Sequence, residues 1–213
     1  MNQDECIEKI VQHFTGDNFS EEVRLAKAEF FERSGVVDEL SSDFDLRMSQ
    51  FLDWYVFTRN MGQGITPLQM VKSKTEVLGI NVEPSTLERL SKVHHSLFDF
   101  LKIKGDDVYI KDIIEGKKII IKKSPILVGF STDEIFDARI VPLEDSYTFT
   151  KGFCFHPPRA RKYILREIKR VKKSTPQEKE DMMLKLLKMR YLFQQYKHVN
   201  VSDIYTDDSK LKI

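Results

Sequence analysis

The sequence SLFDFLKIKGDDVYIKDIIEGKKIII, residues 96–121, is the clearest guide to the fold, because its apolar residues alternate with polar ones as they do in half-buried strands. Two turn segments, Gly105-Asp106-Asp107 and Glu115-Gly116-Lys117, interrupt the alternation. Both have the chemistry of tight turns, since glycine accepts positive φ and aspartate hydrogen-bonds to its own backbone. The pattern predicts short strands that are joined by hairpins.

This β-module continues to residue 156. Further strands are predicted at Ile119–Ile121, Ile126–Val128, Ile135–Leu143 and from Tyr147 to Phe155, which gives about five or six in all. A parallel sheet would need a crossover helix between strands, and no helical segment separates these. The module is therefore predicted to be a small antiparallel β-barrel or curled sheet.

Apolar residues at helical spacing lie on both sides of the module. Before it, helices are predicted at about Cys6–Phe14, 20–35 and 43–59, and Pro67 and Pro84 begin two shorter ones. The third helix is apolar around most of its circumference, so we expect the single tryptophan, Trp54, to be buried there.

After the module, a basic helix is predicted from the Pro157-Pro158 step to about Lys173, and a capping box at Thr175-Pro176-Gln177-Glu178 begins the last helix. The fold class is therefore α+β. We predict an N-terminal helical region at 1–95, the β-module at 96–156, basic C-terminal helices at 157–200 and a flexible tail at 201–213, built around one continuous core.

Composition bounds the class of protein. A chain of 213 residues with 41% hydrophobic residues can bury a substantial core. No apolar run is long enough for a membrane span, and the start, Met-Asn-Gln-Asp-Glu, lacks the signature of a secretory signal. Two cysteines give no disulfide framework and are expected to be plain buried thiols. We predict a cytoplasmic protein without a membrane partner.

Charge is distributed unevenly along a chain whose net charge is +1. Residues 1–60 contain thirteen acids against six lysines and arginines, whereas residues 158–190 contain twelve basic residues against four acids. One interpretation is that these arms attract each other or form solvated helix faces; the functional one is that the basic arm meets an acidic partner. The candidate partner-binding residues are Arg159, Arg161, Lys162, Arg166, Lys169, Arg170, Lys172 and Lys173.

Short motifs occur in a fixed order along the middle of the chain. They are FLDWYVF at 51–57, GITPL at 64–68, LFD at 97–99, VYIKDIIEG at 108–116 and ARIVP at 138–142. In this order they resemble the uncharacterised bacterial proteins that often end in a SEC-C zinc tail. That tail needs a cysteine-rich C-terminus, which this chain lacks, so the resemblance does not imply a zinc function. It also supplies no known catalytic residues.

Side chains suited to a catalytic or metal site are few. Cys154 and His156 share one face of a predicted strand, as two metal ligands would, but no further cysteine or paired histidine lies nearby in sequence. Asp106 and Asp107 fit a hairpin turn, and His94-His95 fits a structural role at a helix-to-strand junction. G-x-S-x-G, Walker and Rossmann motifs do not occur in the sequence. We therefore predict no catalytic residue, no metal site, no cofactor and no enzymatic activity.

Arg166 and Arg170 have the R-x-x-x-R spacing of PilZ receptors for cyclic dinucleotides, which combine such arginines with a small barrel. Here the arginines follow the predicted barrel on a helix instead of leading into it. The companion strand motif of Asp or Asn, Ser and Gly is also missing. A second-messenger receptor is therefore a lesser alternative.

Two functions from different classes remain. A protein-interaction or scaffold module would use the exposed face of the β-module or the helical groove around Trp54, and a nucleic-acid-binding protein would use the basic helix. Nucleic-acid barrels display exposed aromatic residues for base stacking, whereas the aromatic residues between Tyr147 and Phe155 alternate in a way that suits inward packing. The near-neutral pI also differs from that of a dedicated nucleic-acid binder. We predict a non-enzymatic module that binds another protein, with nucleic acid as the alternative partner.

Overall fold

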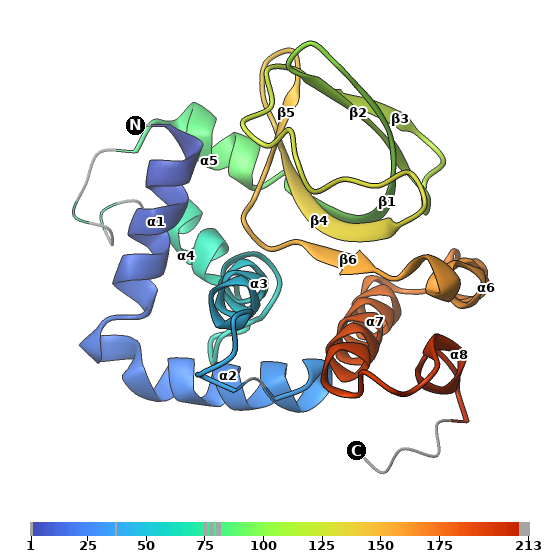
Figure 1. Ribbon diagram of the computed structural model, residues 1–213. Coiled ribbons are helices and arrows are strands. Elements are labelled where there is room, and N and C mark those ends of the chain that lie inside the picture. The colour runs from blue at the N-terminus through green and yellow to red at the C-terminus, as the bar shows by residue number, and fades with distance from the viewer. Residues whose placement is uncertain (1, 37, 75, 77–78, 80–81, 209–213) are drawn as a thin grey trace. The chain divides into compact units, whose positions relative to one another are not determined.

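The computed structural model describes residues 2–36, 38–74, 76, 79 and 82–208. It is an α+β protein with helices towards both ends of the chain and a curled antiparallel sheet, which confirms the predicted fold class (Figure 1). Contacts divide it into two compact units, each of which is built from three stretches of the chain. One unit comprises Met1–Phe30, Val37–His95 and Arg139–Phe153, and the other comprises Phe31–Val36, Ser96–Ala138 and Cys154–Ile213.

The first unit contains the N-terminal helices, except for the last residues of the second helix, which belong to the second unit. They are α1 (Gln3–Phe14), α2 (Ser20–Ser34), α3 (Phe44–Phe57), α4 (Pro67–Ser73) and α5 (Pro84–Leu90), with a short 3-10 turn η1 (Asp17–Phe19) before α2. The predicted helices are thus confirmed. Capping boxes at Asn2 and Thr66 begin α1 and α4, because each side chain accepts a hydrogen bond from a backbone N–H of the first turn.

Aromatic packing fixes α3 within the first unit. The ring of Phe30 lies 5.7 Å from that of Phe51 and 5.3 Å from that of Trp54, measured between ring centroids. The Tyr55 hydroxyl donates to the carbonyl oxygen of Phe14 at 3.1 Å. Trp54 is only 2% exposed, which confirms that it is a core residue. Burying rings of this size is a major source of folding free energy.

Strands in the described part of the chain form one sheet. They are β1 (His94–Lys104), β2 (Asp107–Asp112), β3 (Lys118–Ile121), β4 (Ile135–Pro142), β5 (Tyr147–Phe149) and β6 (Cys154–His156). The order is β3-β2-β1-β4-β5, and β6 pairs with the first residues of β4, Ile135–Asp137. Lys104 lies opposite Asp107, and Gly105 has a φ of +59°, so the predicted Gly105-Asp106-Asp107 hairpin is confirmed.

The predicted strand Ile126–Val128 is wrong. These residues have no strand structure, and Val128 is 81% exposed. Ser124 holds the segment in a turn, since its Oγ accepts from the Ile126 N–H at 3.2 Å and donates to the Ile126 carbonyl oxygen at 2.8 Å. Pro125 has no N–H to offer to a neighbouring strand, so the apolar run does not pair.

The predicted strand from Tyr147 to Phe155 is interrupted, because residues 150–153 bond to side chains of α3. Thr150 still donates its N–H to the Arg139 carbonyl oxygen of β4 at 3.0 Å. Asp53 Oδ2 accepts hydrogen bonds from Thr150 Oγ1 at 2.6 Å and from the Gly152 N–H at 2.9 Å. Gln50 donates to the Phe153 carbonyl oxygen at 2.5 Å. The chain therefore forms β5 and β6 as two separate strands.

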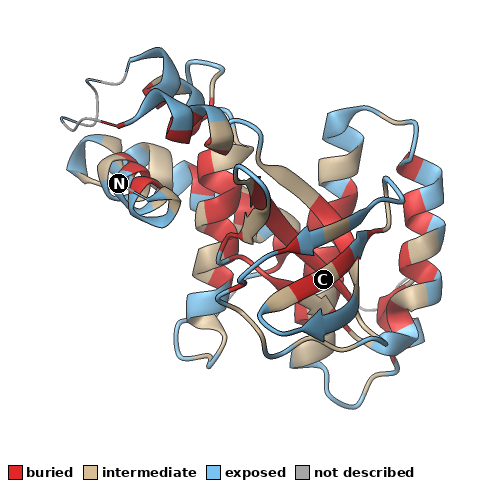
Figure 2. Ribbon diagram, turned by 90° about the horizontal axis from the view of Figure 1, so that it is seen from above, coloured by how far each residue is buried: buried red, intermediate tan, exposed pale blue. Residues whose placement is uncertain are grey.

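The C-terminal helices belong to the second unit. They are η3 (Pro158–Ala160), α6 (Arg161–Val171), α7 (Pro176–Gln195) and α8 (Val201–Ile204). Figure 2 shows their buried residues in red and their exposed residues in blue, as expected of amphipathic helices around a core. Ile164, Ile168, Leu186 and Ile204 belong to this core. The Thr175 capping box is confirmed, since Thr175 Oγ1 accepts from the Glu178 N–H and Glu178 accepts from the Thr175 N–H.

The segment that begins at residue 201 differs from the expected tail over its described part. Val201–Ile204 form α8, and Tyr205 is 4% exposed. Asp207 accepts hydrogen bonds from Tyr163, Arg166 and Lys185. Residues 209–213 lie outside the described residues. The packed structure thus extends beyond the predicted end of the last helix.

Candidate functional site

A groove in the second unit is lined by four of the eight candidate partner-binding residues. Arg159, Lys162, Arg166 and Lys169 are spaced three, four and three residues apart, so they share one face of the η3–α6 segment. Tyr163, Leu165, Ser202 and Tyr205 also line the groove, which has a volume of about 570 Å³. We call this site the basic groove.

Three of the four basic residues in the groove are not neutralised by an acid in the described part of the chain. Arg159, Lys162 and Lys169 are exposed and have no ion pair within the described residues. The fourth, Arg166, pairs with Asp207 at 2.8 Å and lies over the ring of Tyr163, with its Cζ 4.8 Å from the ring centroid. Exposed cations on one face of a helical segment attract an anionic partner.

The other candidate residues have different environments. Arg161 donates two hydrogen bonds to the carboxylate of Asp99, at 2.7 and 3.0 Å, and is thereby committed to the fold. Arg170 pairs with Glu167 at 3.0 Å. Lys172 and Lys173 are exposed but do not line the groove. The eight residues that sequence alone grouped together are therefore divided by the structure into groove residues, ion-paired arginines and two outlying lysines.

A buried carboxylate lies on the core side of α6. Glu167 is 1% exposed and lies 3.0 Å from Arg170, 3.5 Å from Lys185 and 3.6 Å from Arg166, measured between nitrogen and oxygen atoms. A charge at such depth requires counter-ions. Glu167 therefore acts as the shared counter-ion of Arg166, Arg170 and Lys185, and it positions these side chains from the core side of α6.

Both tyrosines of the basic groove are buried. Tyr163 is 7% exposed and Tyr205 is 4% exposed, and the Tyr163 hydroxyl donates to Asp207 at 2.9 Å. Burial raises the pKa of Tyr163, while the hydrogen bond from Lys185 holds the pKa of Asp207 below its ordinary value. Neither ring offers an open face for stacking a nucleobase.

Cys154 and His156, the pair considered as metal ligands, lie in the core of the second unit. Their Sγ and Nε2 atoms are 3.9 Å apart, and His156 Nδ1 is 3.0 Å from the Tyr205 hydroxyl. Burial lowers the pKa of His156 to about 4, so the ring is neutral at physiological pH. Cys6 and Cys154 are both buried free thiols, as expected.

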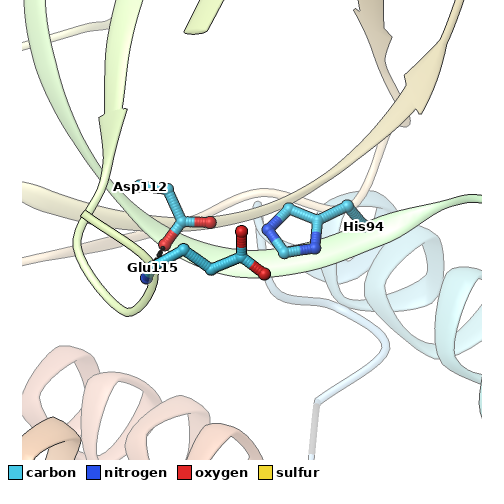
Figure 3. Close-up of side chains that lie close together, drawn as sticks. All are labelled: His94, Asp112 and Glu115. Atoms are coloured by element: carbon cyan, nitrogen blue, oxygen red, sulfur yellow. Dashed lines mark hydrogen bonds between the residues drawn. The ribbon is translucent and has the colours of Figure 1, made fainter. Parts of the chain in front are cut away.

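The turn after β2 contains two acids that are shown in Figure 3, where His94 of the first unit is also drawn. Asp112 Oδ1 accepts hydrogen bonds from the Glu115 N–H at 2.8 Å and from Ser96 Oγ at 2.9 Å. Asp112 is 1% exposed. Its carboxylate therefore shapes the turn of the β2–β3 hairpin.

Sequence reasoning missed Asp53. This residue of α3 is 5% exposed, and its carboxylate accepts from Thr150 and Gly152 in the first unit. Burial raises its pKa, an effect opposed by the charge of Arg139 and by those two hydrogen bonds. One feature of the sequence could have identified Asp53: it is the single acid within the apolar run FLDWYVF, on a helix that was predicted to be buried.

Within the described ranges, no helix combines the length and the apolar character that a bilayer span requires.

Comparisons with known proteins give one match. A family described as a family of unknown function (DUF7986) matches residues 2–205. No curated protein and no solved structure matches this chain. Because the match covers the helices, the sheet and the basic groove, the chain belongs to the DUF7986 family of unknown function.

Proposed function

We propose that this chain is a protein-interaction module whose basic groove binds an acidic segment of another protein. The observation that supports this most is the row of three exposed cations without ion pairs, Arg159, Lys162 and Lys169, along one groove. A non-enzymatic role, a cytoplasmic location and kinship with the bacterial SEC-C-associated proteins belong to the same proposal.

The lining of the groove favours a protein over nucleic acid. Binding of single strands relies on bases stacked against exposed rings, and Tyr163 and Tyr205 are buried. Asp207 lies beside Arg166 and would repel phosphate groups there. A flexible acidic segment can direct its carboxylates to the three unpaired cations and avoid Asp207.

The arrangement supports a cyclic-dinucleotide receptor less well. Its R-x-x-x-R pair would need both arginines at one ligand. Arg166 lines the groove, whereas Arg170 does not and is paired with the buried Glu167.

The test compares two triple variants of equal charge. Arg159→Gln with Lys162→Gln and Lys169→Gln removes the unpaired groove cations, and Lys172→Gln with Lys173→Gln and Lys197→Gln removes three exposed lysines elsewhere in the second unit. Fluorescence anisotropy would follow a labelled Glu-rich peptide, a Gln-rich peptide of equal length, and single- and double-stranded oligonucleotides.

At about 150 mM salt, the wild type should bind the Glu-rich peptide in preference to the other probes. The groove variant should lose about tenfold or more in affinity, because hydrogen bonds to charged groups are involved, and the control variant should bind as the wild type does. Equal losses in both variants would mean that net charge, and not the groove, attracts the peptide. Tighter binding of an oligonucleotide, lost in the groove variant, would establish the nucleic-acid alternative instead.

A further inference from the structure

A second cavity lies in the first unit, independent of the basic groove. It is formed by one side of α1, by α3 and by residues 150–151, and it has a volume of about 200 Å³. Ile7, Val11 and Leu52 give it an apolar wall. These three side chains are only half-buried, so part of their apolar surface remains uncovered in the free protein.

Asp53 places a buried carboxyl group in this apolar cavity. The residue lines the cavity although it is 95% buried, with an exposed fraction of 5%. Both recorded hydrogen bonds, from Thr150 Oγ1 and from the Gly152 N–H, go to Oδ2, and within the described residues Oδ1 has none. Oδ1 can therefore accept a hydrogen bond from a ligand in the cavity that donates one.

The charges around the cavity indicate the sign of such a ligand. Asp4, Glu8 and Asp53 contribute three acidic groups, and Lys151 is the basic residue of the lining. Lys151 is already in an ion pair, since its Nζ lies 2.9 Å from the Glu8 carboxylate. Three acids against one base give the lining a net negative charge, which favours a cation.

We propose that this cavity binds a small molecule with an apolar body and a positively charged amino group, and that the Asp53 carboxylate recognises the amino group while Ile7, Val11 and Leu52 enclose the body. A cation at this position would stabilise the ionised form of a carboxyl group that burial otherwise disfavours.

The volume limits the size of the ligand. A dry apolar cavity of about 150 Å³ accommodates a benzene molecule in other proteins. A cavity of about 200 Å³ therefore fits one aromatic ring or a branched alkyl group with a short chain that ends in the amine. Small pockets of this kind combine an apolar wall with one or two polar groups that fix the orientation of the ligand.

Three matched probes test the proposal on the full chain: phenethylamine, its uncharged analogue phenethyl alcohol, and the anionic hydrocinnamate. Calorimetric titration at neutral pH would measure affinity, and two-dimensional NMR would identify the amide signals that shift. Only the amine should bind appreciably, with shifts at residues of the cavity such as Val11, Leu52 and Thr150.

Two variants and one control assign the contacts. Asp53→Asn keeps the shape of the side chain and removes its charge, so amine affinity should fall about tenfold or more. Val11→Phe fills the apolar part of the cavity and should weaken binding of the amine although Asp53 is unchanged. This variant keeps the test valid if Asp53→Asn folds poorly. Asp17→Asn removes an exposed acid outside the cavity and should change nothing.

Equal affinity for the amine and the alcohol would overturn the proposal, since Asp53 would then not recognise charge. Unchanged amine affinity in a folded Asp53→Asn protein or in Val11→Phe would overturn it as well. The same holds if no cavity signal shifts up to the solubility limit of phenethylamine.

Discussion

Asp53 and Glu167 are both buried carboxylates, one in each unit, but their neighbours differ. Asp53 accepts hydrogen bonds from the neutral donors Thr150 and Gly152 and is influenced by the single charge of Arg139, whereas Glu167 lies among Arg166, Arg170 and Lys185. Asp53 Oδ1 has no hydrogen-bond donor within the described residues, so a ligand can still donate to it. Ion pairs with several cations leave little for a ligand to gain. We therefore expect Asp53 to recognise a ligand and Glu167 to position the side chains of a basic surface.

Replacement of Trp54 tests whether the region around Asp53 is rigid, and it should have the largest effect. Trp54→Ala removes a ring that is 2% exposed, next to Asp53 on α3. The free energy of unfolding should fall by about 3–5 kcal/mol because of the cavity that is left. Urea denaturation measures this loss. A near-normal value would mean that α3 is not anchored and that Asp53 has no fixed position.

Acid should destabilise the second unit through His156. Its pKa is about 4 when folded against an ordinary 6.5, so the neutral form is favoured by folding. This stability is fully present above pH 6.5 and is lost as the pH falls towards 4, by about 3 kcal/mol at about 1.4 kcal/mol per pH unit.

The measurement is the free energy of unfolding between pH 4 and 7 for the wild type and for His156→Gln, which should lack the corresponding fall. His198→Gln, which alters an exposed histidine, should keep the wild-type slope. A variant at position 156 with an unchanged slope would show that another group causes the acid sensitivity.

Neutralising Glu167 should cost more than neutralising Asp53. Glu167→Gln leaves three cations without their shared counter-ion. The full cost of such a change is about 3–5 kcal/mol, and we expect about 2 kcal/mol because Arg166 and Arg170 can be rehydrated. Their side chains are 60% and 62% exposed. Chemical denaturation of Glu167→Gln and Asp53→Asn measures the two losses in the free energy of unfolding. Equal losses would mean that the two carboxylates do not differ in the way described above.

The smallest effect concerns Asp53 itself. Its raised pKa means that the folded protein retains the proton to higher pH than the unfolded chain does, so stability falls as the pH rises above the ordinary value of 3.8 towards the folded pKa. Asp53→Asn should stay within about 1 kcal/mol of the wild type at neutral pH and should lack this fall. Unfolding curves measured from pH 3 upwards, with Asp17→Asn as control, test the sign. A wild type that gains stability over this range relative to Asp53→Asn would contradict it.

Local signals predicted much of the fold. Capping residues at Thr66 and Thr175 and the Gly105 turn act within a few residues, so the sequence contains all that they need. The failures depend on distant partners. The interruption between β5 and β6 requires Asp53 and Gln50, which lie about a hundred residues away in the sequence. No pattern within residues 147–155 predicts these contacts.

The functional residues follow the same rule. Helical spacing suffices to place Arg159, Lys162, Arg166 and Lys169 on one face of a helix. It does not reveal that Arg161 is paired with Asp99, 62 residues away. Charge counting along a chain therefore overestimates a binding surface, because it includes arginines that are committed to the fold.

The interleaving of the two units limits how the chain can be cut. Neither unit is a continuous segment, since the first draws on three stretches and the second on three others. A recombinant fragment covering residues 96–156 would carry Arg139–Phe153 without the helices of their unit, and one covering residues 1–95 would lack the donors that Asp53 needs. Deletion mapping of a binding partner would therefore report misfolding, whereas point variants on the intact chain would report the binding surface.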